Sequence, residues 1–108
     1  HQKLTLQFEQ APLGLIEWDM DFRVVKWNPA AERIFGYACG EAIGHHASFI
    51  VPDGETAVVS RKMQNLLEGV SFDRSSNRSI RKDGSLIDCR WYNSSLRDNQ
   101  GQVVGVIS

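Results

Sequence analysis

The chain has 108 residues, a length typical of a single domain with one hydrophobic core. Apolar residues make up 42% of it, which excludes a disordered segment, and the formal net charge of −1 favours neither a nucleic acid nor an anionic membrane as a partner. The two cysteines, Cys39 and Cys89, belong to no metal-binding motif, and no apolar run reaches the roughly 18 residues that a membrane span needs. We therefore expect a cytoplasmic domain without a metal ion and without membrane contact of its own.

The first elements are predicted to be a short helix and a β-hairpin. Apolar residues recur at helical spacing over 1–12, which predicts an amphipathic flanking helix. Strand patterns follow over 13–18 and 22–27, and the polar break Asp19-Met20-Asp21 between them is typical of a hairpin.

A helix start signal follows directly at Asn28-Pro29. The Asn28 side chain can accept a hydrogen bond from a free backbone N–H of the first turn, and Pro29 suits the first helical position, where its missing N–H costs nothing. Phe35 is predicted to reach the core, and Gly36 can end the helix in a left-handed conformation. The segment therefore predicts one short helix over 29–35.

Further helical segments are predicted over 39–43 and 48–51, before the longest helical pattern of the chain over 53–69. Within this last segment Val59, Met63 and Leu66 share one face. That face is predicted to pack against the sheet.

Three strand patterns complete the chain, over 71–81, 86–96 and 103–108, and Asp83-Gly84 is a strong hairpin signal between the first two. Strands at both ends of the chain, without βαβ alternation, predict an α+β fold in which helices cover one face of an antiparallel sheet. Because the last pattern runs to Ser108, we expect a fragment of a longer protein with its last strand truncated.

Several motifs in this order and spacing resemble one large family, the PAS sensory domains. The resemblance covers nearly the whole chain, and its motifs are Trp27-Asn28-Pro29, Gly36-Tyr37, Glu41-Ala-Ile-Gly44, Arg81-Lys-Asp-Gly84 and Arg97-Asp98 with Gly101-Gln-Val-Val-Gly105. The resemblance implies a PAS fold over 13–108, with a five-stranded antiparallel sheet, several short helices and one longer helix on one face.

The resemblance also implies a function in bacterial signal transduction. We expect a sensory module without catalysis of its own, which forms a homodimer and regulates a covalently linked effector, either a histidine kinase or a diguanylate cyclase. No nucleic-acid partner is expected. The alternative is a ligand-free module that dimerises through the N-terminal helix and the outer sheet face, with Tyr92 and Trp18 as exposed aromatic residues.

Neither haem nor photoactive flavin is expected as a cofactor. Related oxygen sensors carry a ligand histidine early in the long helix, where this chain has Val58 and Val59. Related blue-light receptors carry a reactive cysteine where Ala47 stands, and a flavin-binding asparagine near the position of Cys89.

The strand pattern over 86–96 predicts a candidate ligand pocket. Period-two alternation places Cys89, Trp91 and Asn93 on the inward face, where Phe35, Val59 and Met63 are predicted to join them. An inward asparagine needs hydrogen-bond partners. Two interpretations follow: Asn93 orients a small polar ligand or an ordered water, or Trp91 fills the core and Asn93 bonds to the backbone.

The resemblance implies one further structural pair, between Glu32 on the first helix and Lys82 in the second hairpin. It also implies a poorly capped helix after Gly36-Tyr37, because Ala38 occupies a position that is usually serine or threonine. The adjacent His45 and His46 are predicted to be solvated or to cap a helical turn.

Overall fold

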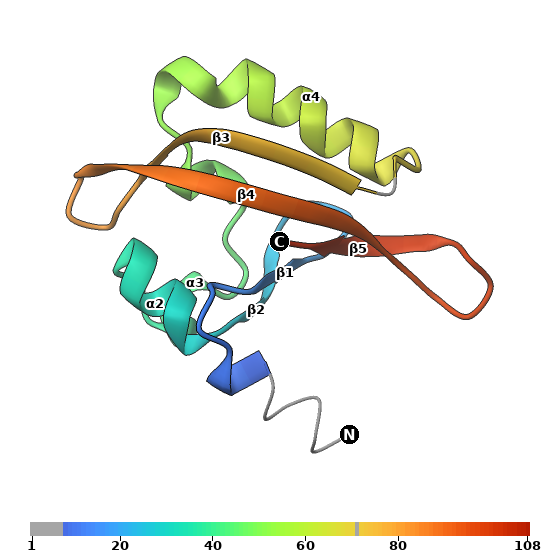
Figure 1. Cartoon of the computed structure of the whole chain (residues 1–108), viewed down its shortest axis with the longest axis horizontal. Coiled ribbons are helices and arrows are strands. Elements are labelled where there is room, and N and C mark those ends of the chain that lie inside the picture. Colours follow the sequence, from blue (N-terminus) through green and yellow to red (C-terminus); the bar gives the residue numbers. More distant parts are fainter. Residues whose placement is uncertain (1–7, 71) are drawn as a thin grey trace.

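The computed structural model describes residues 8–70 and 72–108, and its strands form one antiparallel sheet with the order β2-β1-β5-β4-β3 (Figure 1). The predicted α+β fold and the predicted five-stranded sheet are confirmed. The strands are β1 (Ile16–Trp18), β2 (Val24–Trp27), β3 (Phe72–Ile80), β4 (Leu86–Arg97) and β5 (Val103–Ile107).

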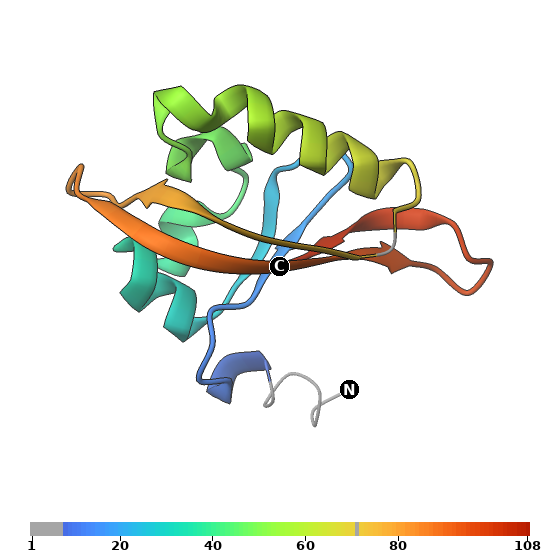
Figure 2. The same ribbon diagram turned by 45° about the horizontal axis from the view of Figure 1, so that its top comes forward.

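The helices of the fold stand between β2 and β3 in the sequence. They are α2 (Pro29–Phe35), α3 (Cys39–Ala42), the 3-10 turns η1 (Ala47–Ile50) and η2 (Asp53–Glu55), and α4 (Thr56–Leu67). The longest of them, α4, runs along the sheet in both views (Figure 2). Of the predicted N-terminal helix, residues 8–10 are helical, and the rest of that prediction lies outside the described residues.

Asn28 joins the start of α2 to the segment that leads into β1. Its Oδ1 accepts hydrogen bonds from Ala31 N at 2.9 Å, as the sequence predicts, and also from Leu15 N at 2.8 Å. Its Nδ2 donates to Leu13 O at 3.0 Å and Phe8 O at 3.1 Å. The side chain is fully buried, and every polar group on it has a hydrogen-bond partner. These hydrogen bonds offset the free-energy cost of removing the amide from water.

The first hairpin turns without a glycine. Asp19 Oδ1 accepts hydrogen bonds from Asp21 N and Arg23 N, which is the usual way in which an aspartate closes a tight turn. Phe22 takes the left-handed conformation with φ of 57°, the one positive φ among the described non-glycine residues. Its side chain is buried, and this burial offsets the backbone strain.

The core lies between the sheet and the helices. Trp27 lies at its centre, with ring centroids 5.4 Å from Phe35 and 5.6 Å from Phe49. The buried hydrophobic residues form one cluster, to which both sheet and helices contribute: Ile16, Trp18, Phe22, Val24, Trp27, Ala31, Phe35, Ala42, Ala47, Ile50, Leu66 and Val106.

One predicted exposure is wrong. Trp18 is 3% exposed, and its indole N–H donates to Ser108 Oγ at 2.9 Å. The reason is that β1 is a central strand, paired with both β2 and β5, whose alternation turns Ile16 and Trp18 toward the helices and Glu17 outward. Tyr92, the other aromatic residue predicted to be exposed, is 48% exposed, which confirms that prediction.

The sheet leaves no room for a side chain at Gly105 on β5. A Cβ atom built there would lie 2.3 Å from the backbone oxygen of Trp18. We expect Gly105→Ala to lower the free energy of unfolding by at least about 2 kcal/mol, because a backbone atom of a paired strand cannot move aside. Denaturant unfolding followed by tryptophan fluorescence measures the change.

Gly40→Ala provides the control for this substitution. Gly40 lies in α3, and no atom is within 4 Å of its Cβ position. We expect this variant to be unchanged or more stable by up to about 1 kcal/mol, from helix propensity alone. Equal stability of the two alanine variants would contradict the packing argument.

Candidate functional site

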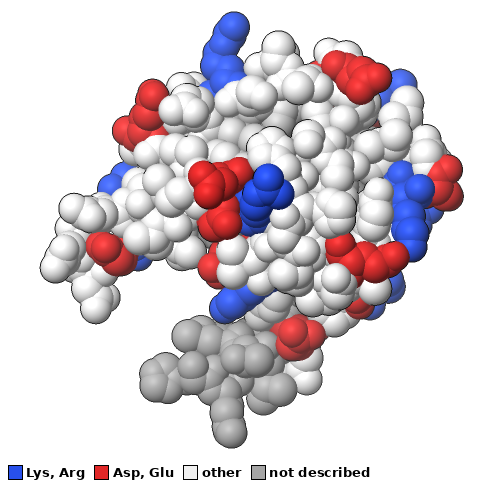
Figure 3. All heavy atoms as spheres, turned by 180° about the vertical axis from the view of Figure 1, so that it is seen from behind, with Lys and Arg blue, Asp and Glu red and all other residues white. Residues whose placement is uncertain are grey.

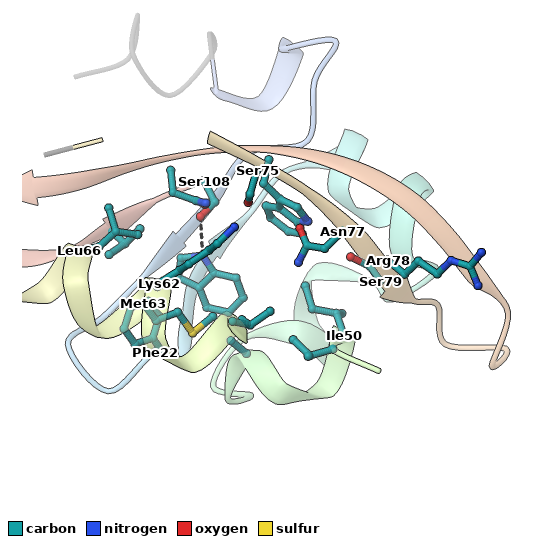
Figure 4. Close-up of a pocket in the computed structure, with 17 residues that line it drawn as sticks. Phe22, Ile50, Lys62, Met63, Leu66, Ser75, Asn77, Arg78, Ser79 and Ser108 are labelled. Atoms are coloured by element: carbon teal, nitrogen blue, oxygen red, sulfur yellow. Dashed lines mark hydrogen bonds between the residues drawn. The ribbon is translucent and has the colours of Figure 1, made fainter. Parts of the chain in front are cut away.

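A cavity of about 60 Å³ lies between α4 and the inner face of the sheet (Figure 4). The sheet contributes residues from β1, β3, β4 and β5, and the helical side contributes residues from η1 and α4. Its apolar lining includes Phe22, Ile50, Met63, Leu66, Trp91 and Val106. Its polar lining includes Lys62, Ser75, Asn77, Ser79, Asn93 and Ser108.

The polar side of the cavity comes from the register of β3 against β4. The inward positions of β3 are Asp73, Ser75, Asn77 and Ser79, all polar. The register places these four opposite Asn93, Trp91, Cys89 and Ile87 respectively. An inner sheet face is normally apolar, so this row is an exception that packing alone does not explain.

Within the described part of the chain, Asn77 Oδ1 is buried and accepts no hydrogen bond. Leaving such an atom without a partner costs roughly 1–3 kcal/mol. Asp73 Oδ2 and Glu55 Oε2 are buried in the same way, but neither residue lines the cavity. Asn77 differs from them in lining the cavity, although its Oδ1 itself lies below the cavity surface.

The structure brings together four of the six residues predicted for the pocket. Trp91, Asn93, Val59 and Met63 line the cavity. The Asn93 side chain makes no hydrogen bond to residues 8–70 or 72–108, so the predicted bond from Asn93 to the backbone is not found there.

Phe35 and Cys89 do not line the cavity. Phe35 stacks on the Trp91 ring, with centroids 5.9 Å apart and planes at 24°. Cys89 packs against the core. The prediction for Phe35 is corrected because the Trp91 ring, on which Phe35 stacks, is the one that faces the cavity, and the prediction for Cys89 is corrected because its side chain belongs to the packed core.

Sequence reasoning missed Lys62 and the inward residues of β3. The period-two recurrence of small polar residues over Asp73, Ser75, Asn77 and Ser79 was the available signal, since strand geometry turns all four to one face. Lys62 follows from no pattern, because a lysine beside an apolar helix face ordinarily extends to solvent.

The predicted pair between Glu32 and Lys82 is replaced by a different arrangement. Lys82 Nζ lies 2.5 Å from Glu41 Oε2, and the Glu32 carboxylate accepts a hydrogen bond from Cys39 N. The reason is that the start of α3 lies close to the end of α2, so the free N–H groups of α3 attract Glu32 while Glu41 faces the β3–β4 hairpin.

The same carboxylates correct the prediction that α3 is poorly capped. Ala38 has no side-chain acceptor, but Glu41 Oε1 accepts a hydrogen bond from Ala38 N at 2.9 Å. Together with Glu32 at Cys39 N, it satisfies two of the free N–H groups at this helix end.

The two adjacent histidines serve the local structure. His46 Nδ1 accepts a hydrogen bond from Ser48 N at 3.1 Å and so caps η1, as predicted. His45 stacks on Phe49, with ring centroids 5.1 Å apart. Among the residues that the structure describes, no three His, Cys, Asp or Glu side chains are placed to hold a metal ion.

The family model described as "PAS fold" matches residues 2–108. The chain belongs to the PAS family. The model spans the Asn28 cap, the hairpins and every strand described above, so the family resemblance of the sequence is confirmed. In the described residues of this PAS domain, no helix has the length and apolar character to cross a membrane.

Solved structures of PAS domains share this fold. A PAS domain from Colwellia psychrerythraea superposes with a TM-score of 0.91 at 19% identity, over 98% of this chain and 90% of that one. A PAS domain of a LuxR-family transcriptional regulator from Burkholderia thailandensis, in complex with ethanol, gives 0.79 at 20% identity over 95% and 91%. An RNA-binding Light-Oxygen-Voltage receptor gives 0.84 at 25% identity over 98% of this chain, which spans 30% of that receptor.

The pair between Glu41 and Lys82 predicts a pH-dependent contribution to stability. The hydrogen bond from Lys82 and then that from Ala38 N hold the pKa of the Glu41 carboxyl below its ordinary value of 4.5. A carboxyl whose pKa is lower in the folded state stabilises the fold above its ordinary pKa and stops doing so as pH falls through the lowered value. We expect Glu41→Gln to lower the melting temperature at pH 7 and to match the parent below the lowered pKa.

Glu68→Gln is the control for this charge effect. Glu68 accepts a hydrogen bond from the neutral amide of Gln64 and pairs with no cation among the described residues. Melting curves of both variants from neutral to acid pH make the comparison. A Glu41→Gln deficit that persists unchanged at the lowest pH would show that the loss is steric and not electrostatic.

Proposed function

We propose that this PAS domain is a sensory module that binds a small molecule in the cavity and thereby regulates a linked effector domain. The observation that carries the proposal is a cavity in the core that is lined by Lys62 and by the polar inward row Ser75, Asn77 and Ser79 of β3, beside Trp91. A filled core would have no use for a cation and a row of polar side chains at this position, whereas a binding site uses such groups for orientation.

Haem and flavin do not belong to this proposal. The cavity of about 60 Å³ is far below the roughly 300–1,000 Å³ of sites for drug-sized ligands. Trp91 occupies part of the inner sheet face, and Ala47 stands where the resemblance places a reactive cysteine. A small ligand also fits the precedent of the Burkholderia thailandensis domain, which is in complex with ethanol.

The route from ligand to effector is proposed to run through Ser108. Its backbone N and O both pair with Ile16 at 2.8 Å, its hydroxyl accepts from Trp18, and it lines the cavity. A ligand that binds more tightly to one packing arrangement around Ser108 would shift the conformational equilibrium of the linked effector domain. We propose a histidine kinase or a diguanylate cyclase as that effector, in the cytoplasm, with no catalysis by the PAS domain itself.

Filling the cavity is expected to abolish binding. Val59 lines it from α4, so Val59→Phe places a ring in the space that a ligand needs. We expect the parent protein to gain melting temperature with at least one compound in a screen of small polar metabolites, and Val59→Phe to lose that gain. Differential scanning fluorimetry measures both.

Val58→Phe is the matched control, because Val58 is the neighbouring residue of the same helix but is 58% exposed and does not line the cavity. It should keep the ligand-induced gain. A gain that survives in Val59→Phe, or a haem or flavin band in the absorption spectrum of the purified protein, would contradict the proposal.

A second proposed function is homodimerisation through the outer face of the sheet. Tyr92 and Phe72 are 48% and 54% exposed there, and Arg74 stands directly opposite Tyr92 in the register. Aromatic and arginine side chains together are typical of interface centres. Charges do not suggest a nucleic acid instead, since Arg78 is paired with Asp88 on this face, the net charge is −1, and basic and acidic side chains are also interspersed on the opposite side of the molecule (Figure 3).

We expect Tyr92→Ser to raise the dimer dissociation constant at least about tenfold, because removing a central aromatic residue commonly costs about 2 kcal/mol of binding. Sedimentation equilibrium measures the constant. Val58→Ser removes a comparably exposed apolar side chain from α4, away from the sheet face, and should leave it unchanged. A monomeric parent protein would refute the dimer.

A further inference from the structure

Strand β3 forms one edge of the sheet, and among the described strands it pairs with β4 alone. It runs for nine residues without a lysine, a proline or a bulge. Natural proteins usually protect a long edge strand with such features, because its unpaired backbone groups accept another strand. The edge of β3 is therefore a place where an extended segment can add to the sheet.

Hydrogen bonds outside the strand ladder show which backbone groups of β3 face this edge. Arg81 N donates to Ser85 O across the hairpin at 2.8 Å, so the backbone groups of odd-numbered residues point toward β4. Those of even-numbered residues point away from β4, and Arg78 N accordingly donates to Glu55 Oε1 at 3.3 Å. A carboxylate of the domain itself thus occupies one edge N–H.

Arg74 and Ser76 carry the open part of the edge. By the same alternation their N–H and C=O groups point away from β4, and no described residue outside the sheet forms a hydrogen bond with them. Both residues are exposed. Such an edge presents donors and acceptors in turn, which another polypeptide strand satisfies and a phosphate chain, which only accepts, does not. The edge favours a peptide over a nucleic acid.

The outer face beside this edge is basic. It carries one aspartate, Asp88, and three arginines on β3 and β4: Arg74, Arg78 and Arg90. Asp88 pairs with Arg78 at 3.5 Å, whereas Arg74 and Arg90 form no ion pair with the described residues. Ser76, directly opposite Arg90, is too small to cover it. Like charges keep a second copy of this edge away, whereas acidic side chains complement it.

The register determines where acidic residues stand in such a segment. Because Glu55 occupies the Arg78 N–H, an added strand stops at that point. It lies beside Ser76, Arg74 and Phe72, and the residues directly opposite these three are two apart and face the same outer side. The first two meet the arginines, and the third meets the Phe72 ring, which is 54% exposed.

We propose that the β3 edge binds an acidic extended segment of another protein as a sixth, antiparallel strand. The pattern of this segment is acid-x-acid-x-apolar, with its acids opposite Ser76 and Arg74 and its apolar residue opposite Phe72. The nearby acids of the domain do not oppose it, since Asp73 turns inward and Glu55 reaches the edge from η2. This binding requires neither the cavity nor the outer-face dimer.

The capped heptapeptide Thr-Glu-Thr-Glu-Thr-Val-Thr is the probe, and the same peptide with lysine for glutamate is its charge control. NMR titration of the ¹⁵N-labelled protein measures both dissociation constants. We expect the lysine peptide to bind at least about tenfold more weakly. Arg74→Glu should reverse this order, whereas Arg61→Glu, an equal charge change at an exposed position of α4, should preserve it.

The strand geometry is tested separately from the charge. Bound peptide should slow hydrogen exchange of the Arg74 and Ser76 amides, which face the edge, and leave unchanged that of Ser75 and Asn77, which face β4. N-methylation of the second glutamate removes a peptide N–H that faces β3 and should weaken binding at least about tenfold. Methylation of the threonine before it removes an N–H that faces solvent and should leave binding unchanged.

Equal binding of the glutamate and lysine peptides, equal effects of the two N-methyl groups, or unchanged exchange at Arg74 and Ser76 would overturn the acidic strand. Tighter binding of a uridine octanucleotide would overturn it in favour of a nucleic acid. Proline at an edge removes an outward N–H and spares the ladder to the neighbouring strand. Self-association that Ser76→Pro abolishes would therefore assign the edge to a second copy instead.

Discussion

The hydrogen bonds of Asn28 are the constraint on which the rest of this fold depends. One buried amide holds the first turn of α2 through Ala31 N and the entry to β1 through Leu15 N. With α2 fixed in this way, Phe35 at its last turn reaches the sheet and stacks on Trp91. The position of the Trp91 ring then decides which part of the inner face is filled and which part is open. A local capping interaction thus determines where the cavity lies.

Local chemistry of this kind is what sequence reasoning predicts well. Asn28 and Gly36 mark the two ends of α2, because capping acts within four residues of the chain. Alternation along β4 likewise turns Trp91 and Asn93 inward, whichever strands lie beside it. The partner of Lys82 could not be predicted in the same way. Glu32 and Glu41 are both acidic residues near helix ends, and the choice between them depends on how α2 and α3 meet in space.

The candidate site shows the same division. The sequence places Trp91 and Asn93 on the inner face correctly, but an inner face is not yet a cavity. Cys89 shares that face but packs against the hydrophobic core and does not line the cavity. Lys62 lines the cavity because the inner face of β3, which lies opposite α4, carries small polar residues that leave room for the lysine side chain. The positions of Cys89 and Lys62 do not follow from the residue spacing along one helix or strand, because both depend on side-chain volumes in three neighbouring elements.

The two helices nearest Trp91 are held with different strength. Helix α2, which lies beyond the Trp91 ring, buries Ala30, Ala31 and Phe35 and has a side-chain cap. Helix α4, which lines the cavity, buries Leu66 alone and has no side-chain cap at its start. Elements with few buried contacts open and move at lower free-energy cost than the core. A ligand in the cavity would contact α4 through residues such as Val59 and Met63, and the low cost of moving this helix would give the ligand a conformational equilibrium to shift.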